Sequence, residues 1–119
     1  MEVELDAFSG RPNPRWRLLP YQTREFTNKL QRLPRQHKRA ATAEQGLGYR
    51  GFIVTGASDE LGNYDEVVVT NGAVHARSGP VSHYLEDQDR ALERWLLETM
   101  RGRLDEALYR YVLGRLSSL

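Results

Sequence analysis

The sequence predicts a single α+β domain over residues 1–119, with a mainly antiparallel sheet of about four strands and helices packed on one face. Three observations lead there: residues 2–7 alternate between apolar and acidic, Asn71-Gly72 separates two β-branched runs, and apolar residues recur at helical spacing after residue 91. Hairpin-joined strands followed by helices are typical of the α+β class. A length of 119 residues suffices for one hydrophobic core.

The N-terminal third predicts a strand, a short return strand and a helix. The alternation of EVELDA indicates a half-buried strand with Asp6 on its polar face. RWRLL alternates again around Trp16, so we expect a short extension that folds back beside the first strand. Apolar residues at helical spacing lie between Pro20, which suits a first helical turn, and Pro34, which cannot continue a helix. These prolines predict a helix over about 20–33.

The middle of the chain predicts a loop, a strand and a hairpin. Residues 35–48 are polar and basic and read as an exposed loop, whereas YRGFIVTG is rich in β-branched and aromatic residues. Asn71-Gly72 is the favoured type I′ turn, and a two-residue turn fixes the pairing of the strands beside it. We therefore expect Val68 opposite His75 and Glu66 opposite Arg77, all four on the face away from the core.

The C-terminal third predicts a connection followed by helices. SGPVSHYLED reads as a connection, and either Asp87 or Asp89 is expected to cap the next helix. An apolar stripe continues to Gly102, and a further helical pattern covers 104–116. The sequence leaves open whether these patterns form two helices or one helix interrupted at Gly102. The predicted order of elements is β-α-β-β-β-α-α.

The sequence lacks the residues that several kinds of functional site require. The chain has no cysteine, so disulfides, thiolate nucleophiles and Cys-ligated metal centres are excluded. The histidines at 37, 75 and 83 have no metal-ligand spacing, and the acidic stretch 59–66 does not match a calcium-binding loop. No phosphate-binding glycine loop and no G-x-S-x-G turn is present. We expect no metal and no cofactor.

The charge is unevenly distributed along the chain. Residues 1–50 carry ten Lys/Arg against five Asp/Glu, whereas residues 51–119 carry seven against eleven, for a total of +1. The basic stretch 32–39 suggests nucleic-acid binding as one alternative, but the acidic second half and a pI near 8.1 make it unlikely to be the main function. Without an apolar run of membrane-spanning length or a signal-peptide pattern, we expect a cytoplasmic protein that does not enter a membrane.

The stretch DAFSGRPNPRW predicts a stiff loop. Pro12 and Pro14 restrict their own backbone and that of Arg11 and Asn13 before them. A rigid mount suits a guanidinium group that binds a carboxylate or phosphate, because little conformational entropy is lost on binding. In the alternative interpretation the loop is structural: Arg11 pairs with Asp6 or Glu4, and the prolines protect an edge strand.

A functional loop would work with the polar face of the sheet. Asp6 and His75 are then the candidate catalytic acid and base, because a histidine titrates near neutral pH. The ligand-binding candidates are Arg11, Asn13, Trp16 and Arg77.

The sequence favours a small binding or accessory protein that recognises a compact anionic molecule or an acidic segment of a partner protein. The alternatives are a small cofactor-free enzyme of cyclase, isomerase or hydrolase type and a nucleic-acid-associated protein. The apolar C-terminal helices also suggest a homodimer.

Overall fold

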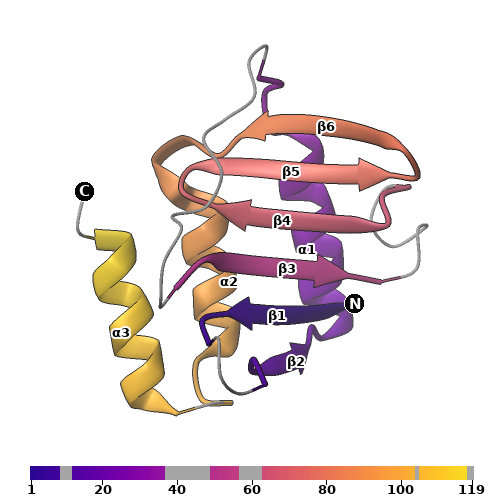
Figure 1. The fold of residues 1–119 in the computed structure, drawn as a ribbon. Coiled ribbons are helices and arrows are strands. Elements are labelled where there is room, and N and C mark those ends of the chain that lie inside the picture. The colour runs from indigo at the N-terminus through magenta and orange to yellow at the C-terminus, as the bar shows by residue number, and fades with distance from the viewer. Residues whose placement is uncertain (9–11, 37–48, 57–62, 104, 118–119) are drawn as a thin grey trace.

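The computed structural model describes residues 1–8, 12–36, 49–56, 63–103 and 105–117. It confirms the α+β class: a six-stranded sheet in the order β2-β1-β3-β4-β5-β6, with every neighbouring pair antiparallel (Figure 1). The strands are β1 (Glu2–Asp6), β2 (Arg15–Arg17), β3 (Gly51–Thr55), β4 (Glu66–Thr70), β5 (Ala73–Ser78) and β6 (Val81–Glu86). The α-helices are α1 (Pro20–Gln31), α2 (Ala91–Met100) and α3 (Glu106–Ser117).

The described sheet has six strands where about four were expected, and β2 and β6 make up the difference. The extension around Trp16 does fold back beside β1, as β2. The stretch 81–86, however, was predicted to be a connection, and it pairs with β5 along its whole length. VSHYLE lacks a clean alternation of apolar and polar residues, and only Leu85 is buried. Its strand conformation therefore depends on backbone hydrogen bonds to β5, which the residue pattern does not reveal.

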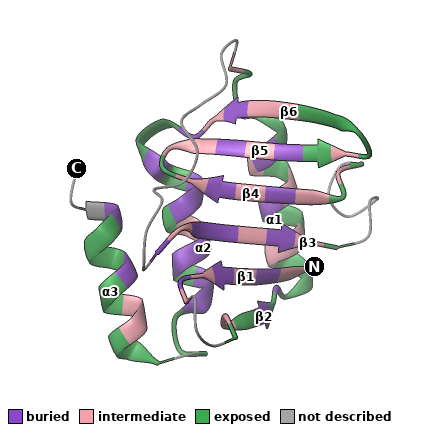
Figure 2. Ribbon diagram, viewed as in Figure 1, coloured by how far each residue is buried: buried purple, intermediate pink, exposed green. Residues whose placement is uncertain are grey.

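The hairpin register is confirmed at every predicted pair, including Val68 with His75 and Glu66 with Arg77. Asn71 and Gly72 have φ of 52° and 76°, as a type I′ turn requires. Figure 2 shows the resulting alternation of buried and less buried positions along the central strands. The core face carries the fully buried residues Val3, Leu5, Phe52, Val54, Val67, Val69, Val74 and Ala76.

Helices cover one face of the sheet. In Figure 1, α1 and α2 lie behind the strands, and α3 packs along α2. The α1 residue Phe26 is fully buried and its ring lies 6.1 Å from that of Trp95 on α2. The two C-terminal helical patterns are separate helices, which part at Gly102 with φ of 79°. We call the other side of the sheet, which none of the described helices covers, the open face.

The start of α2 is capped from the loop before it. Both carboxylate oxygens of Asp87 accept hydrogen bonds, from the backbone N–H groups of Leu92 at 2.8 Å and Glu93 at 3.0 Å. Asp87 is therefore the capping residue of the two that the sequence offered. In the described part of the chain, no helix has both the length and the apolar character that crossing a membrane requires.

Candidate functional site

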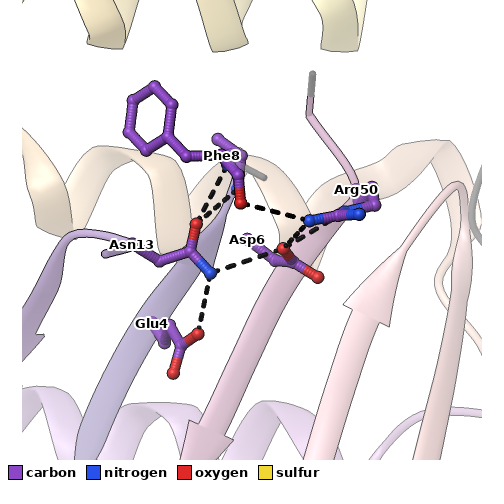
Figure 3. Close-up of polar contacts among 6 residues, drawn as sticks. Glu4, Asp6, Phe8, Asn13 and Arg50 are labelled. Carbon is purple, nitrogen blue, oxygen red and sulfur yellow. Dashed lines mark hydrogen bonds and ion pairs between the residues drawn. The ribbon is translucent and has the colours of Figure 1, made fainter. Parts of the chain in front are cut away.

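The loop between β1 and β2 is closed by the side chain of Asn13 (Figure 3). Its amide oxygen accepts hydrogen bonds from the backbone N–H groups of Ala7 and Phe8, at 3.1 and 3.0 Å. Its amide nitrogen donates to Glu4 at 2.9 Å and, more weakly, to Asp6 at 3.4 Å. Pro14 then returns the chain to β1 by accepting a hydrogen bond from the Leu5 N–H. Both the oxygen and the nitrogen of the Asn13 amide are therefore engaged in hydrogen bonds that connect this residue to the end of β1.

The carboxylate of Asp6 forms an ion pair with the guanidinium group of Arg50. The guanidinium group donates through Nε at 3.2 Å and through Nη2 at 2.9 Å to the Asp6 carboxylate, and through Nη2 to the carbonyl of Phe8. The backbone N–H of Arg50 also donates to the Asp6 carbonyl at 2.8 Å. Arg50 therefore ties the start of β3 to the end of β1. Arg11, which was expected to occupy or to approach this place, lies outside the described residues.

Asp6 and His75 share the open face but lie far apart. β3 and β4 separate their strands, and because neighbouring strands are about 4.8 Å apart, the two side chains start roughly 14 Å from one another. His75 instead shares a 2.9 Å hydrogen bond with Ser82 Oγ and stacks on the ring of Tyr84, with ring centres 4.8 Å apart. The two candidate acid-base residues therefore do not meet at one substrate position.

The remaining predicted ligand residues are also separated. Trp16 points into the core, where it is 6% exposed and its indole N–H donates to Thr99 Oγ1 at 2.9 Å. Arg77 lies on the open face, 3.9 Å from Glu66 across the hairpin. Asn13 and Asp6 are thus the only predicted site residues that touch within the described chain. Of the basic stretch 32–39, residues 37–39 lie outside the described residues.

A buried polar network lies at the start of α2. Glu93 is fully buried and receives a bidentate contact from Arg90, with both distances 2.9 Å. Tyr49 donates a hydrogen bond to the same carboxylate. Burial, reinforced by the Glu93 charge, raises the pKa of the Tyr49 hydroxyl, and burial likewise raises the pKa of Asp87 above its ordinary value of 3.8. Because these groups satisfy one another, the network has the character of a structural brace.

A cleft of a size that suits a small ligand lies beside this network. It has a volume of about 500 Å³ and separates the end of α1 from the turn that leads into α2. Ligand sites commonly measure roughly 300–1,000 Å³. The lining residues are Lys29, Arg32, Leu33, Pro34, Glu86, Asp87, Gln88, Asp89, Ala91 and Leu92.

Lys29 and Arg32 are the cations of this cleft. They lie three positions apart on the last turn of α1, so they project from neighbouring parts of its surface. Neither side chain forms a hydrogen bond or ion pair with another described residue. The sequence did not point to Lys29, because basic residues at the end of a helix are common for electrostatic reasons, and it offered Arg32 only as the start of the basic stretch 32–39. The three-residue spacing of Lys29 and Arg32 is visible in the sequence. The sequence does not show that residues in the range 86–92 form the opposite wall of the cleft.

Among the described residues, no three His, Asp or Glu side chains gather closely enough to hold a metal ion. Comparison with known proteins adds no assignment: no family model, curated protein or solved structure matches the chain.

Proposed function

We propose that the chain is a small binding protein that holds a compact anionic ligand in the cleft between α1 and α2. One observation carries the proposal: Lys29 and Arg32 line a cleft of ligand size, and neither has a carboxylate partner among the described residues. An anion placed there gains two charge-assisted hydrogen bonds without breaking an existing ion pair. Leu33, which is partly exposed, lines the same space and can contact the body of the ligand, whereas Leu92 beneath it is buried in the core.

The open face is less suited to the same ligand. Arg50 already binds Asp6 at 2.9 Å, and Arg77 lies 3.9 Å from Glu66. An anion or an acidic partner segment would have to displace these carboxylates, and the electrostatic gain of the new contact would be reduced by the loss of the old one. This comparison favours the cleft over the loop that the sequence suggested.

The proposal is tested by titrating the protein with inorganic phosphate and with citrate while backbone amide resonances are followed by NMR. We expect saturable shifts at residues 29–34 and 87–92, together with a raised melting temperature. Each of Lys29→Ala and Arg32→Ala should weaken binding by about tenfold, which is the order expected for one charged hydrogen bond. Arg24→Ala is the matched control, because Arg24 is exposed on the same helix and does not line the cleft.

A separate outcome identifies a purely structural role for the two cations. If Lys29 and Arg32 serve only the negative end of the α1 dipole, their removal lowers the melting temperature and neither anion produces saturable shifts. Equal weakening of binding by Arg24→Ala would show that general charge attraction, rather than the cleft, attracts the anion. Either result would overturn the proposed site.

A second candidate, a hydrolase-type activity, is favoured by the 2.9 Å hydrogen bond between His75 and Ser82. In such a reaction Ser82 Oγ attacks an ester carbonyl, His75 takes the hydroxyl proton and passes it to the leaving alcohol, and water then releases the acyl group. Arg77, opposite Ser82 in the register, lies beside this pair. The test is hydrolysis of p-nitrophenyl acetate: activity that is unchanged in Ser82→Ala refutes this candidate.

A further inference from the structure

The turn before α2 has an unusual backbone that presents Asp89 at the cleft. Asp89 and Arg90 both adopt left-handed conformations, with φ of 57° and 56°. Residues other than glycine rarely do so, and two in succession cost conformational energy that the surrounding contacts must offset. Asp89 is exposed, lines the cleft, and has no hydrogen bond or ion pair with another described residue.

The buried network supplies the contacts that hold this turn. Arg90 is anchored to the fully buried Glu93, and Glu93 also accepts a hydrogen bond from Tyr49. On the other side of Asp89, the carboxylate of Asp87 is held by the first backbone N–H groups of α2. Asp89 is therefore flanked on both sides by anchored residues, so that its backbone is held at the edge of the cleft before any ligand arrives.

The cleft thus carries opposite charges on separate elements. Lys29 and Arg32 come from the end of α1, whereas the acidic residues Glu86, Asp87 and Asp89 come from the end of β6 and the turn before α2. The side chains of Lys29, Arg32 and Asp89 are not paired with another described residue. A ligand with only a negative charge would satisfy the cations and leave Asp89 facing that charge. A ligand that also bears an ammonium group would satisfy both walls.

On the basis of the proposed anion site, we infer that the preferred ligand is a small zwitterion with an apolar body. Its carboxylate binds Lys29 and Arg32, and its ammonium group binds Asp89. Leu33 is partly exposed and lines the space between these walls, so an apolar body packed against it removes apolar surface from water. An α-amino acid with a branched aliphatic side chain has this chemistry.

Three matched probes separate the contributions of the two charges. Leucine carries both, 4-methylpentanoate lacks the ammonium group, and 3-methylbutylamine lacks the carboxylate. We expect leucine to bind about fivefold more tightly than 4-methylpentanoate, the upper range for an exposed ion pair, with amide shifts at both cleft walls in NMR titrations. The amine alone should bind more weakly than leucine, because it does not contact the cations.

The Asp89→Asn variant tests the role of the carboxylate. Asparagine tolerates the left-handed conformation, so the turn should persist. In this variant leucine and 4-methylpentanoate should bind with equal affinity, whereas Glu106→Gln, on the exposed surface of α3, should keep the wild-type preference.

The outcomes distinguish this inference from the proposed function. Equal binding of leucine and 4-methylpentanoate to the wild type, or a preference that survives in Asp89→Asn, overturns the zwitterion and leaves the anion site intact. No saturable binding of either carboxylate probe, of phosphate or of citrate overturns both. Tighter binding of 3-methylbutylamine than of leucine also overturns both, because it makes the cleft a cation site.

Discussion

Replacement of Asn13 by alanine gives the sharpest test of the loop between β1 and β2. The substitution removes an acceptor from the N–H groups of Ala7 and Phe8 and a donor from Glu4, in hydrogen bonds of 3.1, 3.0 and 2.9 Å. All three bonds are partly buried, so water can replace some of what is lost. At about 0.5–1.5 kcal/mol for each bond, we expect a loss of about 2 kcal/mol in the free energy of unfolding.

Asn13→Asp separates the acceptor from the donor of the amide. A carboxylate can still accept from the two N–H groups, but it cannot donate, and it adds negative charge next to Glu4 and Asp6. At neutral pH this variant should therefore be less stable than Asn13→Ala.

Urea unfolding followed by far-ultraviolet circular dichroism measures both effects, with a companion melting experiment. A loss of about 2 kcal/mol corresponds to a decrease of about 8 °C in the melting temperature for a domain of this size. An Asn13→Ala protein within about 0.5 kcal/mol of the wild type would refute the reasoning, since that is the size of an ordinary surface substitution. The loop would then be held by its prolines without the amide.

Three further predictions concern buried groups. Glu93→Gln removes the buried carboxylate that Arg90 contacts and should cost about 3–5 kcal/mol in urea unfolding. Gly51→Ala should cost about 2 kcal/mol or more, because φ is 120° and the added Cβ would lie 2.6 Å from Thr70 Cβ. Burial raises the pKa of Asp87, so the folded chain holds that proton more tightly than the unfolded chain does. As the pH rises above 3.8, the wild type should therefore lose stability relative to Asp87→Asn, which unfolding curves at a series of pH values would measure.

Matched controls make these predictions specific. Glu106→Gln removes an exposed carboxylate that pairs with Arg110 at 3.3 Å and should leave stability unchanged. Gly79→Ala changes a glycine with φ of 56° and no atoms near the added Cβ, so it should cost only about 1 kcal/mol. Equal effects of each test variant and its control would contradict the assigned role of burial or crowding. A constant difference between wild type and Asp87→Asn across the pH series would contradict the raised pKa.

The accuracy of the fold prediction varied with how local the relevant interactions are. The hairpin at Asn71-Gly72 was correct in every pair because the turn and the flanking residues fix the register together. The helix predicted over 20–33 ends two residues earlier, at Gln31. β6 was missed because its pairing with β5, rather than an alternation of its own residues, makes it a strand.

Asp6, His75 and Arg77 were correctly placed on the open face, but the sequence did not show how far apart they lie. The open-face positions of Asp6 and His75 followed from strand periodicity, yet the intervening β3 and β4 keep them apart. The partner of Asp6 is Arg50, which is 44 residues away in the chain. In the sequence Arg50 was visible only as a charged residue near the start of the predicted strand YRGFIVTG, and nothing local linked it to Asp6.

The sequence by itself determined the α+β class, the faces of the central strands and the hairpin register, since these depend on side-chain periodicity and turn chemistry within a few residues. Only the tertiary structure decided that Glu93 is fully buried and paired, and that Lys29 and Arg32 share a cleft with Asp89. These features arise where residues distant in the chain meet. Their charges and spacings are visible in the sequence, but their distances depend on how the helices pack against the sheet.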